Sequence, residues 1–377
     1  MKQDLALRIL SEIMSWPDER ARREFDWLRL MAHWQYDGYR DFLAGVRFIE
    51  SMATWLQQFA PEERETAYKL IRNSLIYICP SKMHHLVEHF YPRYVEQQLL
   101  SMVSSRLNIP KYRIWTNPPA TNEYKKLKRK TLFMALSEGA RIDSFRHANV
   151  GHLSNEQIVV ATQVDSEKWD DMLSSLREDL NDPEALFAMV FLIDDFMGTG
   201  TSFLRFDDAK NKWKGKLMRF GDSIKAAHEK QRGIGPFVTD AHICVHHYIA
   251  SYKAATGIQA IMNDAKNKIP CMMKFFREIK FTFGMILPED MPVDKENNVN
   301  ADFIPLTKKY YDPVLRNKHT DVGRVDHLGL GYGGCALPLV LEHNTPNDSI
   351  ALLWAETDGG GGAHAMKPLF RRRQRHS

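Results

Sequence analysis

One segment in the middle of the chain joins a buried strand, two acidic residues and a glycine-rich loop, in that order. Residues 188–193 form a short, continuous apolar run, which is typical of a strand buried on both faces of a parallel sheet. Asp194 and Asp195 follow directly, and the loop at residues 198–202 comes next. Because open α/β sheets bind ligands at the carboxyl ends of their strands, we expect a ligand here. The pattern predicts acids that bind sugar hydroxyls and a loop that binds phosphate.

Two common nucleotide-binding loops do not fit this segment. A Walker loop has a lysine directly before its terminal Ser or Thr, whereas Thr201 precedes Ser202 here. A dinucleotide fingerprint places its glycines about twenty residues before the acid, which is the reverse of this order. Residues 329–334 match GxGxxG, but we expect a proline-bearing strand after them instead of the required helix. A solvated turn, with Ser202 as an ordinary helix N-cap, stays open as an alternative for the acidic segment.

The acidic segment resembles the ligand motif of the type I phosphoribosyltransferase superfamily, which binds phosphoribosyl pyrophosphate (PRPP). The resemblance implies that Asp194 and Asp195 are catalytic, hold the ribose hydroxyls and act as ligands of Mg²⁺. Gly198 stands where the family usually has a threonine, and Thr201 where a small residue is common. These two departures still allow the loop to bind phosphate, but they count against an ordinary catalyst of this family. The resemblance implies that the 5-phosphate is bound by Gly198, Thr199, Gly200, Thr201 and Ser202.

An earlier strand carries the second half of the expected site. Residues 131–136 are predicted to form a strand, and a tight turn follows them. Backbone amides in such a turn and the fixed charge of Arg141 are suited to an anion. The family resemblance implies that this turn grips the pyrophosphate of PRPP, through Ser137, Glu138, Gly139, Ala140 and Arg141.

The periodicity of the apolar residues divides the chain into a helical part and an α/β part. Up to residue 108 the apolar residues recur at helical spacing, so we expect a helical domain at 1–108. Strands and helices alternate afterwards, which predicts a doubly wound, mainly parallel sheet in a phosphoribosyltransferase-like domain at 109–377. Residues 340–354 are expected to form a β-hairpin segment. The other candidate strands are 157–161, 188–193, 241–245 and 279–287, with helices at 167–180 and 249–265.

The last part of the chain suggests a biological setting. Residues 331–371 resemble a bacterial group of phosphoribosyltransferase-like proteins associated with antiviral conflict systems, notably at 343–347, 353–354 and 369–371. The likeness implies a defence effector, with PRPP or a related ribose 5-phosphate as ligand. Two alternatives stay open. One is a non-catalytic PRPP or nucleotide sensor that acts on a protein partner through the helical domain; the other is a nucleic-acid-binding protein, suggested by basic runs at 125–130 and 371–375.

The composition indicates the general class of the protein but does not distinguish between these functions. A formal charge of +4 is small for 377 residues, so nucleic acid is not favoured. The four cysteines are scattered without CxxC spacing, which favours a reduced compartment and no structural zinc. No apolar run approaches the roughly 20 residues that cross a bilayer, and the first residues lack a signal-peptide core. We therefore expect a cytoplasmic protein with no membrane contact.

Overall fold

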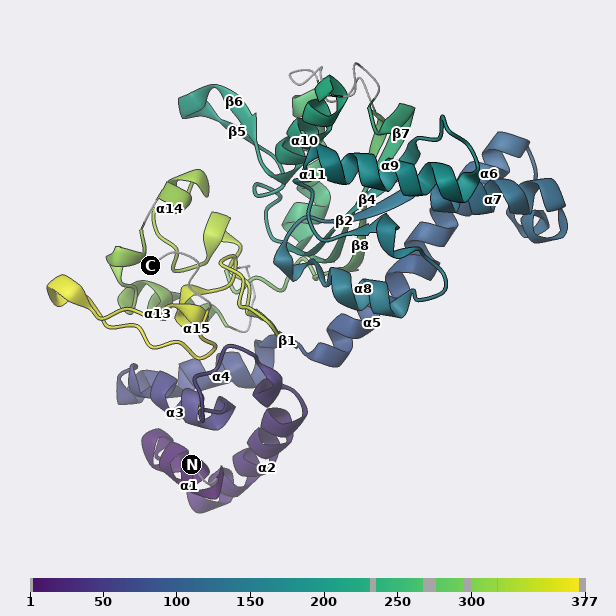
Figure 1. Cartoon of the computed structure of the whole chain (residues 1–377). Coiled ribbons are helices and arrows are strands. Elements are labelled where there is room, and N and C mark those ends of the chain that lie inside the picture. The colour runs from purple at the N-terminus through teal and green to yellow at the C-terminus, as the bar shows by residue number, and fades with distance from the viewer. Residues whose placement is uncertain (1–2, 231–234, 267–275, 295–299, 317, 373–377) are drawn as a thin grey trace. The chain divides into compact units, whose positions relative to one another are not determined.

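The computed structural model describes residues 3–230, 235–266, 276–294, 300–316 and 318–372 (Figure 1). The chain divides into two units: unit 1 consists of residues 1–83 and 288–377, and unit 2 of residues 84–287. Residue 108, where the sequence suggested a boundary, therefore lies inside unit 2. In the described part of the chain, no helix is long and apolar enough to cross a membrane.

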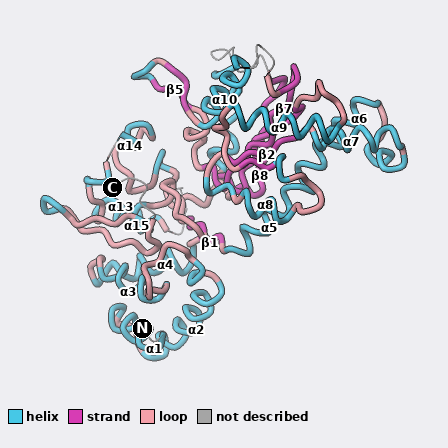
Figure 2. The backbone as a smooth tube through the Cα atoms, in the orientation of Figure 1, coloured by secondary structure: helices cyan, strands magenta, loops and turns pink. Residues whose placement is uncertain are grey.

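A five-stranded parallel sheet forms the centre of unit 2, and nearly all of the strand structure in Figure 2 lies there. All neighbouring strands pair in parallel, in the order β3-β2-β4-β7-β8. Every residue of β4 up to Asp194 is buried, as expected for a strand covered on both faces. The predicted doubly wound α/β sheet is thus confirmed. The strands are β2 (Thr131–Ala135), β3 (Ile158–Val159), β4 (Phe187–Met197), β7 (Phe237–Ala250) and β8 (Phe276–Ile286).

Helices cover both faces of this sheet (Figure 1). Apolar residues of α9, α10 and α11 form one buried cluster with Val190, Leu192 and Val245 of the strands. On the other face, Phe90 and Phe145 pack against strand aromatics such as Phe191. The helices are α5 (Pro80–Phe90), a π-helical turn (Tyr91–Val95), α6 (Glu96–Leu107), α7 (Pro118–Arg129), α8 (Ile142–Ala148), α9 (Ser166–Leu180), α10 (Lys216–Lys230) and α11 (Tyr252–Lys266).

Both ends of the chain build unit 1. Strand β1 (Ile76–Ile78) pairs in parallel with β9 (Leu339–Leu341), so segments far apart in sequence lie side by side. The side chain of Trp55 joins them again, because its Nε1 donates to the carbonyl of Leu352 at 2.7 Å. The described helices of unit 1 are α1 (Gln3–Met14), α2 (Asp18–Trp34), α3 (Phe48–Gln57), α4 (Arg64–Ser74), α13 (Ile304–Lys309), α14 (Lys318–Val322) and α15 (Ala351–Trp354).

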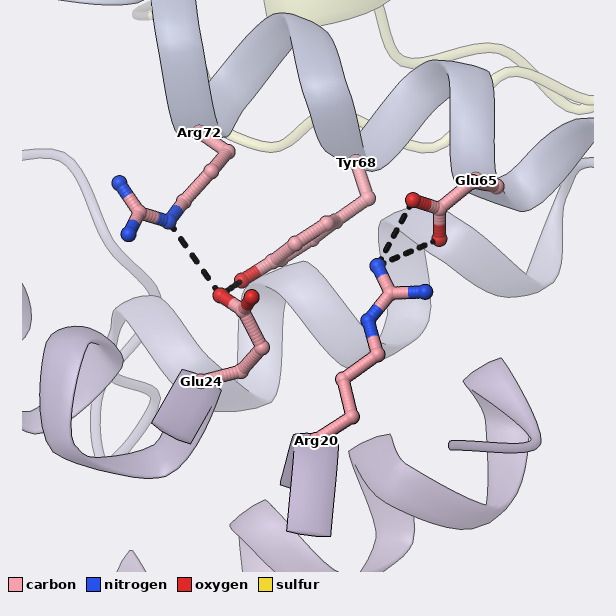
Figure 3. A network of polar contacts seen from close by, with 5 residues as sticks. All are labelled: Arg20, Glu24, Glu65, Tyr68 and Arg72. Atoms are coloured by element: carbon pink, nitrogen blue, oxygen red, sulfur yellow. Dashed lines mark hydrogen bonds and ion pairs between the residues drawn. The ribbon is translucent and has the colours of Figure 1, made fainter. Parts of the chain in front are cut away.

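A polar network joins α2 to α4 (Figure 3). The Tyr68 hydroxyl donates to Glu24 Oε2 at 2.5 Å, and Arg72 Nε donates to the same oxygen at 3.2 Å. One turn away, Arg20 Nη2 lies 2.7 and 2.9 Å from the two carboxylate oxygens of Glu65. Burial and the neighbouring Glu24 carboxylate raise the pKa of Tyr68, so its hydroxyl stays a donor. The network therefore links two successive turns of α2 to α4 by polar contacts.

Two expectations about unit 1 are wrong. Residues 76–78 were expected to be helical, but they form β1 because β9 offers them a partner that sequence spacing does not reveal. The expected hairpin at 340–354 does not form as two paired strands: the antiparallel pairing is limited to one bridge between Leu341 and Asn344, β9 pairs with β1, and Ala351–Trp354 is the short helix α15. All four residues of α15 are buried, so they lack the alternating exposure of a surface hairpin.

Candidate functional site

The strand order of unit 2 places the two predicted loops at one point of the sheet. From β2 the chain passes to β3 on one side and then returns to β4 on the other. Ligands of open α/β sheets bind at such a reversal, beyond the carboxyl ends of the strands. Residues 137–141, here called loop A, follow β2, and residues 198–204, loop B, follow β4. The structure therefore brings together the two halves of the site that the sequence suggested.

The acidic pair lies within β4, which extends to Met197 instead of ending at residue 193. Successive strand residues point to opposite faces, so the two carboxylates diverge. Asp194 is only 1% exposed; Ser137 Oγ donates to its Oδ1, and Lys216 Nζ forms an ion pair with its Oδ2. Burial raises the pKa of Asp194, and the Lys216 ammonium opposes that rise.

Asp195 is half-buried and faces loop A. Its Oδ1 accepts a 2.8 Å hydrogen bond from the backbone N–H of Phe196. A Cβ added at Gly139 would lie 2.2 Å from Asp195 Oδ2, closer than any real contact. A larger residue at this position would therefore displace the Asp195 carboxylate from its place beside loop A.

Loop A contains a further unusual backbone position. Residues Glu138–Ala140 form a 3₁₀ turn, and Arg141 has a φ of +51° immediately before α8. A non-glycine residue in the left-handed region costs about 1–2 kcal/mol, and such strain concentrates at functional loops. The turn thus has a defined, strained conformation.

Loop B is held by several contacts of its own. Gly200 has a φ of +81°, a conformation that favours glycine. The hydroxyls of Thr199 and Thr201 lie 2.9 Å apart, and Ser251 Oγ donates to the carbonyl of Gly198 at 2.5 Å. Hydroxyl groups and a glycine backbone are therefore concentrated within a few residues, as a phosphate loop requires.

No helix begins at Ser202, the residue that the solvated-turn alternative made a helix N-cap. Loop B leads into a hairpin of β5 (Arg205–Asp207) and β6 (Lys212–Lys214), and α10 begins only at Lys216. The chain then returns to loop B, because the Lys216 N–H donates to the carbonyl of Ser202 at 3.1 Å. The hairpin is an insertion between the loop and its helix.

Two charged or polar side chains of this region were missed in the sequence. Lys216 was missed because the hairpin separates it from the acidic segment. His247 lies on β7 with Nε2 3.8 Å from Asp194 Oδ2, and burial together with Lys216 lowers its pKa to about 3. The available signal was the polar run at residues 246–248, which interrupts a buried strand that we expected to end at residue 245.

The carboxylate beside loop A could be one ligand of a magnesium ion whose other ligands are water and phosphate oxygens. Within the described residues, no cluster of three or more His, Cys, Asp or Glu side chains could hold a metal ion. Mg²⁺ in phosphate sites is usually held by one or two carboxylates, by water and by phosphate oxygens. The half-buried carboxylate of Asp195 fits that role.

A family of known proteins matches most of the chain. A model of the PRTase-CE family, phosphoribosyltransferases of the conflict-effector type, matches residues 52–372. No curated protein and no solved structure matches the chain. The matched region contains all of unit 2 and begins well before residue 109, so the family includes part of the helical amino-terminal segment. The chain belongs to the PRTase-CE family.

Proposed function

We propose that this protein binds PRPP, or a closely related ribose 5-phosphate, at the carboxyl ends of β2 and β4 and transfers its phosphoribosyl group. The observation that carries the proposal is that loops A and B follow neighbouring strands at the reversal of strand order, in a member of a phosphoribosyltransferase-like family. Asp195 lies on β4 shortly before loop B, and its carboxylate packs against Gly139 of loop A.

The chemistry assigns each loop a role. Loop B would hold the 5-phosphate through its hydroxyls and backbone, and loop A would hold the pyrophosphate. As the bond between the anomeric carbon and pyrophosphate breaks, the electron pair leaves with pyrophosphate, and a nucleophile bonds to the carbon. The carboxylate of Asp195 would hold ribose hydroxyls and stabilise the positive charge that develops on the sugar. Bound Mg²⁺ would supply charge neutralisation for the leaving group.

The close contact between Gly139 and Asp195 provides a sharp test. We expect PRPP with Mg²⁺ to raise the melting temperature of the wild type, since ligand at 100 times its Kd stabilises by about 2.7 kcal/mol. Gly139→Ala should lose this rise, because the new methyl group displaces the Asp195 carboxylate. Asp195→Asn should keep the unliganded melting temperature and also lose the rise.

The matched control is Gly257→Ala, in helix α11 of the same unit, where an added Cβ meets no atom within 4 Å. This variant should keep the PRPP response and gain up to about 1 kcal/mol of stability. A full PRPP response in both Gly139→Ala and Asp195→Asn would disprove the site. Release of pyrophosphate by the wild type would identify an enzyme, whereas binding without release would favour the sensor alternative.

We also propose an antiviral role, supported by membership of a conflict-effector family. A partner would contact the helical segment, where Leu30 and Trp34 are exposed one turn apart on α2. The test is phage challenge of bacteria that express the chain with its neighbouring genes, with Asp195→Asn as the comparison. Protection by the wild type alone is expected, and equal protection by both would exclude a role for the site.

A further inference from the structure

Asp194 occupies a different environment from Asp195. Its carboxylate is almost wholly buried, and each of its oxygens has a separate partner. Oδ1 accepts from Ser137, the first residue of loop A, while Oδ2 pairs with Lys216, the first residue of α10. The Asp194 carboxylate is thus held on both oxygens below the surface, whereas the Asp195 side chain is more exposed to solvent.

Lys216 extends these contacts to loop B. Its backbone N–H donates to Ser202, while its side chain, 17% exposed, reaches Asp194. The close approach depends on Gly215, whose φ is +133° and where an added Cβ would lie 2.2 Å from the carbonyl oxygen of Phe203. The path from Ser137 through Asp194 and Lys216 to Ser202 therefore connects loop A with loop B.

We propose that Asp194 is a positioning residue that holds loops A and B in register through Ser137 and Lys216, and that Asp195 alone offers a carboxylate to the ligand. This inference rests on the proposed function for the identity of the ligand. The connection between the loops does not depend on which ligand binds. A buried ion pair suits this task, because removing one partner leaves an uncompensated buried charge and the geometry of the pair is narrow.

The first test uses the full chain without ligand. Hydrogen–deuterium exchange of residues 137–141 and 198–204 should rise at least tenfold in Asp194→Asn and in Lys216→Met, because each variant breaks the connection. Asp195→Asn serves as the control and should leave exchange in loop B unchanged. Wild-type exchange in both loops of Asp194→Asn, or an equal rise in Asp195→Asn, would overturn the proposal whatever the ligand is.

The ion pair can be tested by a double variant. Lys216→Met alone leaves a buried, unpaired carboxylate, so Asp194→Asn combined with Lys216→Met should melt at a higher temperature than Lys216→Met alone. The loops should nevertheless remain mobile in the double variant. If Asp194→Asn does not fold, Ser137→Ala breaks only the contact with loop A and should raise exchange there alone; unchanged exchange would overturn the proposal.

Binding separates the two acids. PRPP affinity of Asp194→Asn should fall at least tenfold while the remaining binding still requires Mg²⁺, because the ligand carboxylate is intact. Asp195→Asn should lose the Mg²⁺ requirement together with binding. Loss of the Mg²⁺ requirement in Asp194→Asn with wild-type exchange would make Asp194 a direct ligand and overturn the proposal. Wild-type chain that does not bind PRPP at all would refute the proposed function, whereas the exchange experiment would still decide the connection between the loops.

Discussion

Two adjacent histidines on β7 show how burial sets the charge of a side chain. His246 is fully buried, stacks on Phe90 with ring centroids 4.2 Å apart, and pairs its Nδ1 with Thr282 Oγ1 at 2.9 Å. Burial lowers the pKa of His246 well below its ordinary value, and the neighbouring His247 lowers it further. Both imidazoles are therefore neutral in the folded protein at neutral pH.

Acid should destabilise the protein through these residues. Below pH 6.5 the histidines of the unfolded chain are protonated, whereas the buried imidazoles of the folded protein stay neutral. The free energy of unfolding therefore falls as the pH drops toward the folded pKa, which is about 3 for His247. The slope is at most about 1.4 kcal/mol per pH unit for each histidine. Urea unfolding at pH 7, 5.5 and 4.5 measures it, and His246→Phe should show a shallower loss than wild type.

His246 is the cleaner choice for this test, because His247 also faces Asp194, Asp195 and Lys216. The comparison concerns the slope with pH, since the lost bond to Thr282 changes the stability of the variant at every pH. Parallel slopes for the variant and the wild type would contradict the assignment of a neutral, buried His246.

At the scale of elements, the β5–β6 hairpin is an addition to the basic α/β plan. Its strands pair Phe206 with Trp213 in register, with ring centroids 5.5 Å apart, and Lys214 forms an ion pair with Asp207. Its two ends are adjacent: a Cβ added at Gly215 would lie 3.0 Å from Leu204 Cα. Because residues 204 and 215 are already adjacent, a short linker can replace the hairpin without moving the chain on either side of it.

Replacement of residues 206–214 by a Gly-Ser linker keeps Arg205, whose Nη1 donates to the carbonyl of Thr201 in loop B, and should therefore leave unit 2 folded. We expect a loss of about 1–2 kcal/mol, because Trp213 packs partly against the core of unit 2. The response to PRPP should persist, since the bond between Lys216 and Ser202 joins loop B to α10 without the hairpin. Circular dichroism and thermal shift measure both. A folded deletion variant that does not respond to PRPP would instead assign the hairpin to the ligand site.

At the scale of the whole molecule, the two units differ in how the chain builds them. Unit 2 is one continuous stretch of sequence, whereas the core of unit 1 combines residues from both ends, including Trp55 and Phe370. Phe370 lies within 6.0 Å, between ring centroids, of Tyr36, Phe48 and Tyr77. The amino-terminal helices thus depend on the carboxyl-terminal segment for part of their core.

A fragment of residues 80–287, which keeps α5 whole, should fold alone and melt cooperatively. Residues 1–83 alone should not, because strand β1 and the aromatic cluster lack their partners. Co-expression of 1–83 with 288–377 is the control and should restore a folded complex. Circular dichroism and gel filtration provide the measurements, and cooperative melting of 1–83 alone would contradict the shared core.

The sequence by itself determined the features whose signals are local. The apolar run of β4, the acids after it and the turn after β2 are each contiguous, so hydrophobic pattern and motif predicted the parallel sheet and loops A and B. Tertiary structure alone decided the pairing of β1 with β9, the helical state of Ala351–Trp354 and the divergence of Asp194 from Asp195. It also brought Lys216 and His247 to Asp194. The reason is physical: strand partners and the charge of a buried group depend on residues that are distant in the chain, and a local pattern carries no information about which of them will be neighbours.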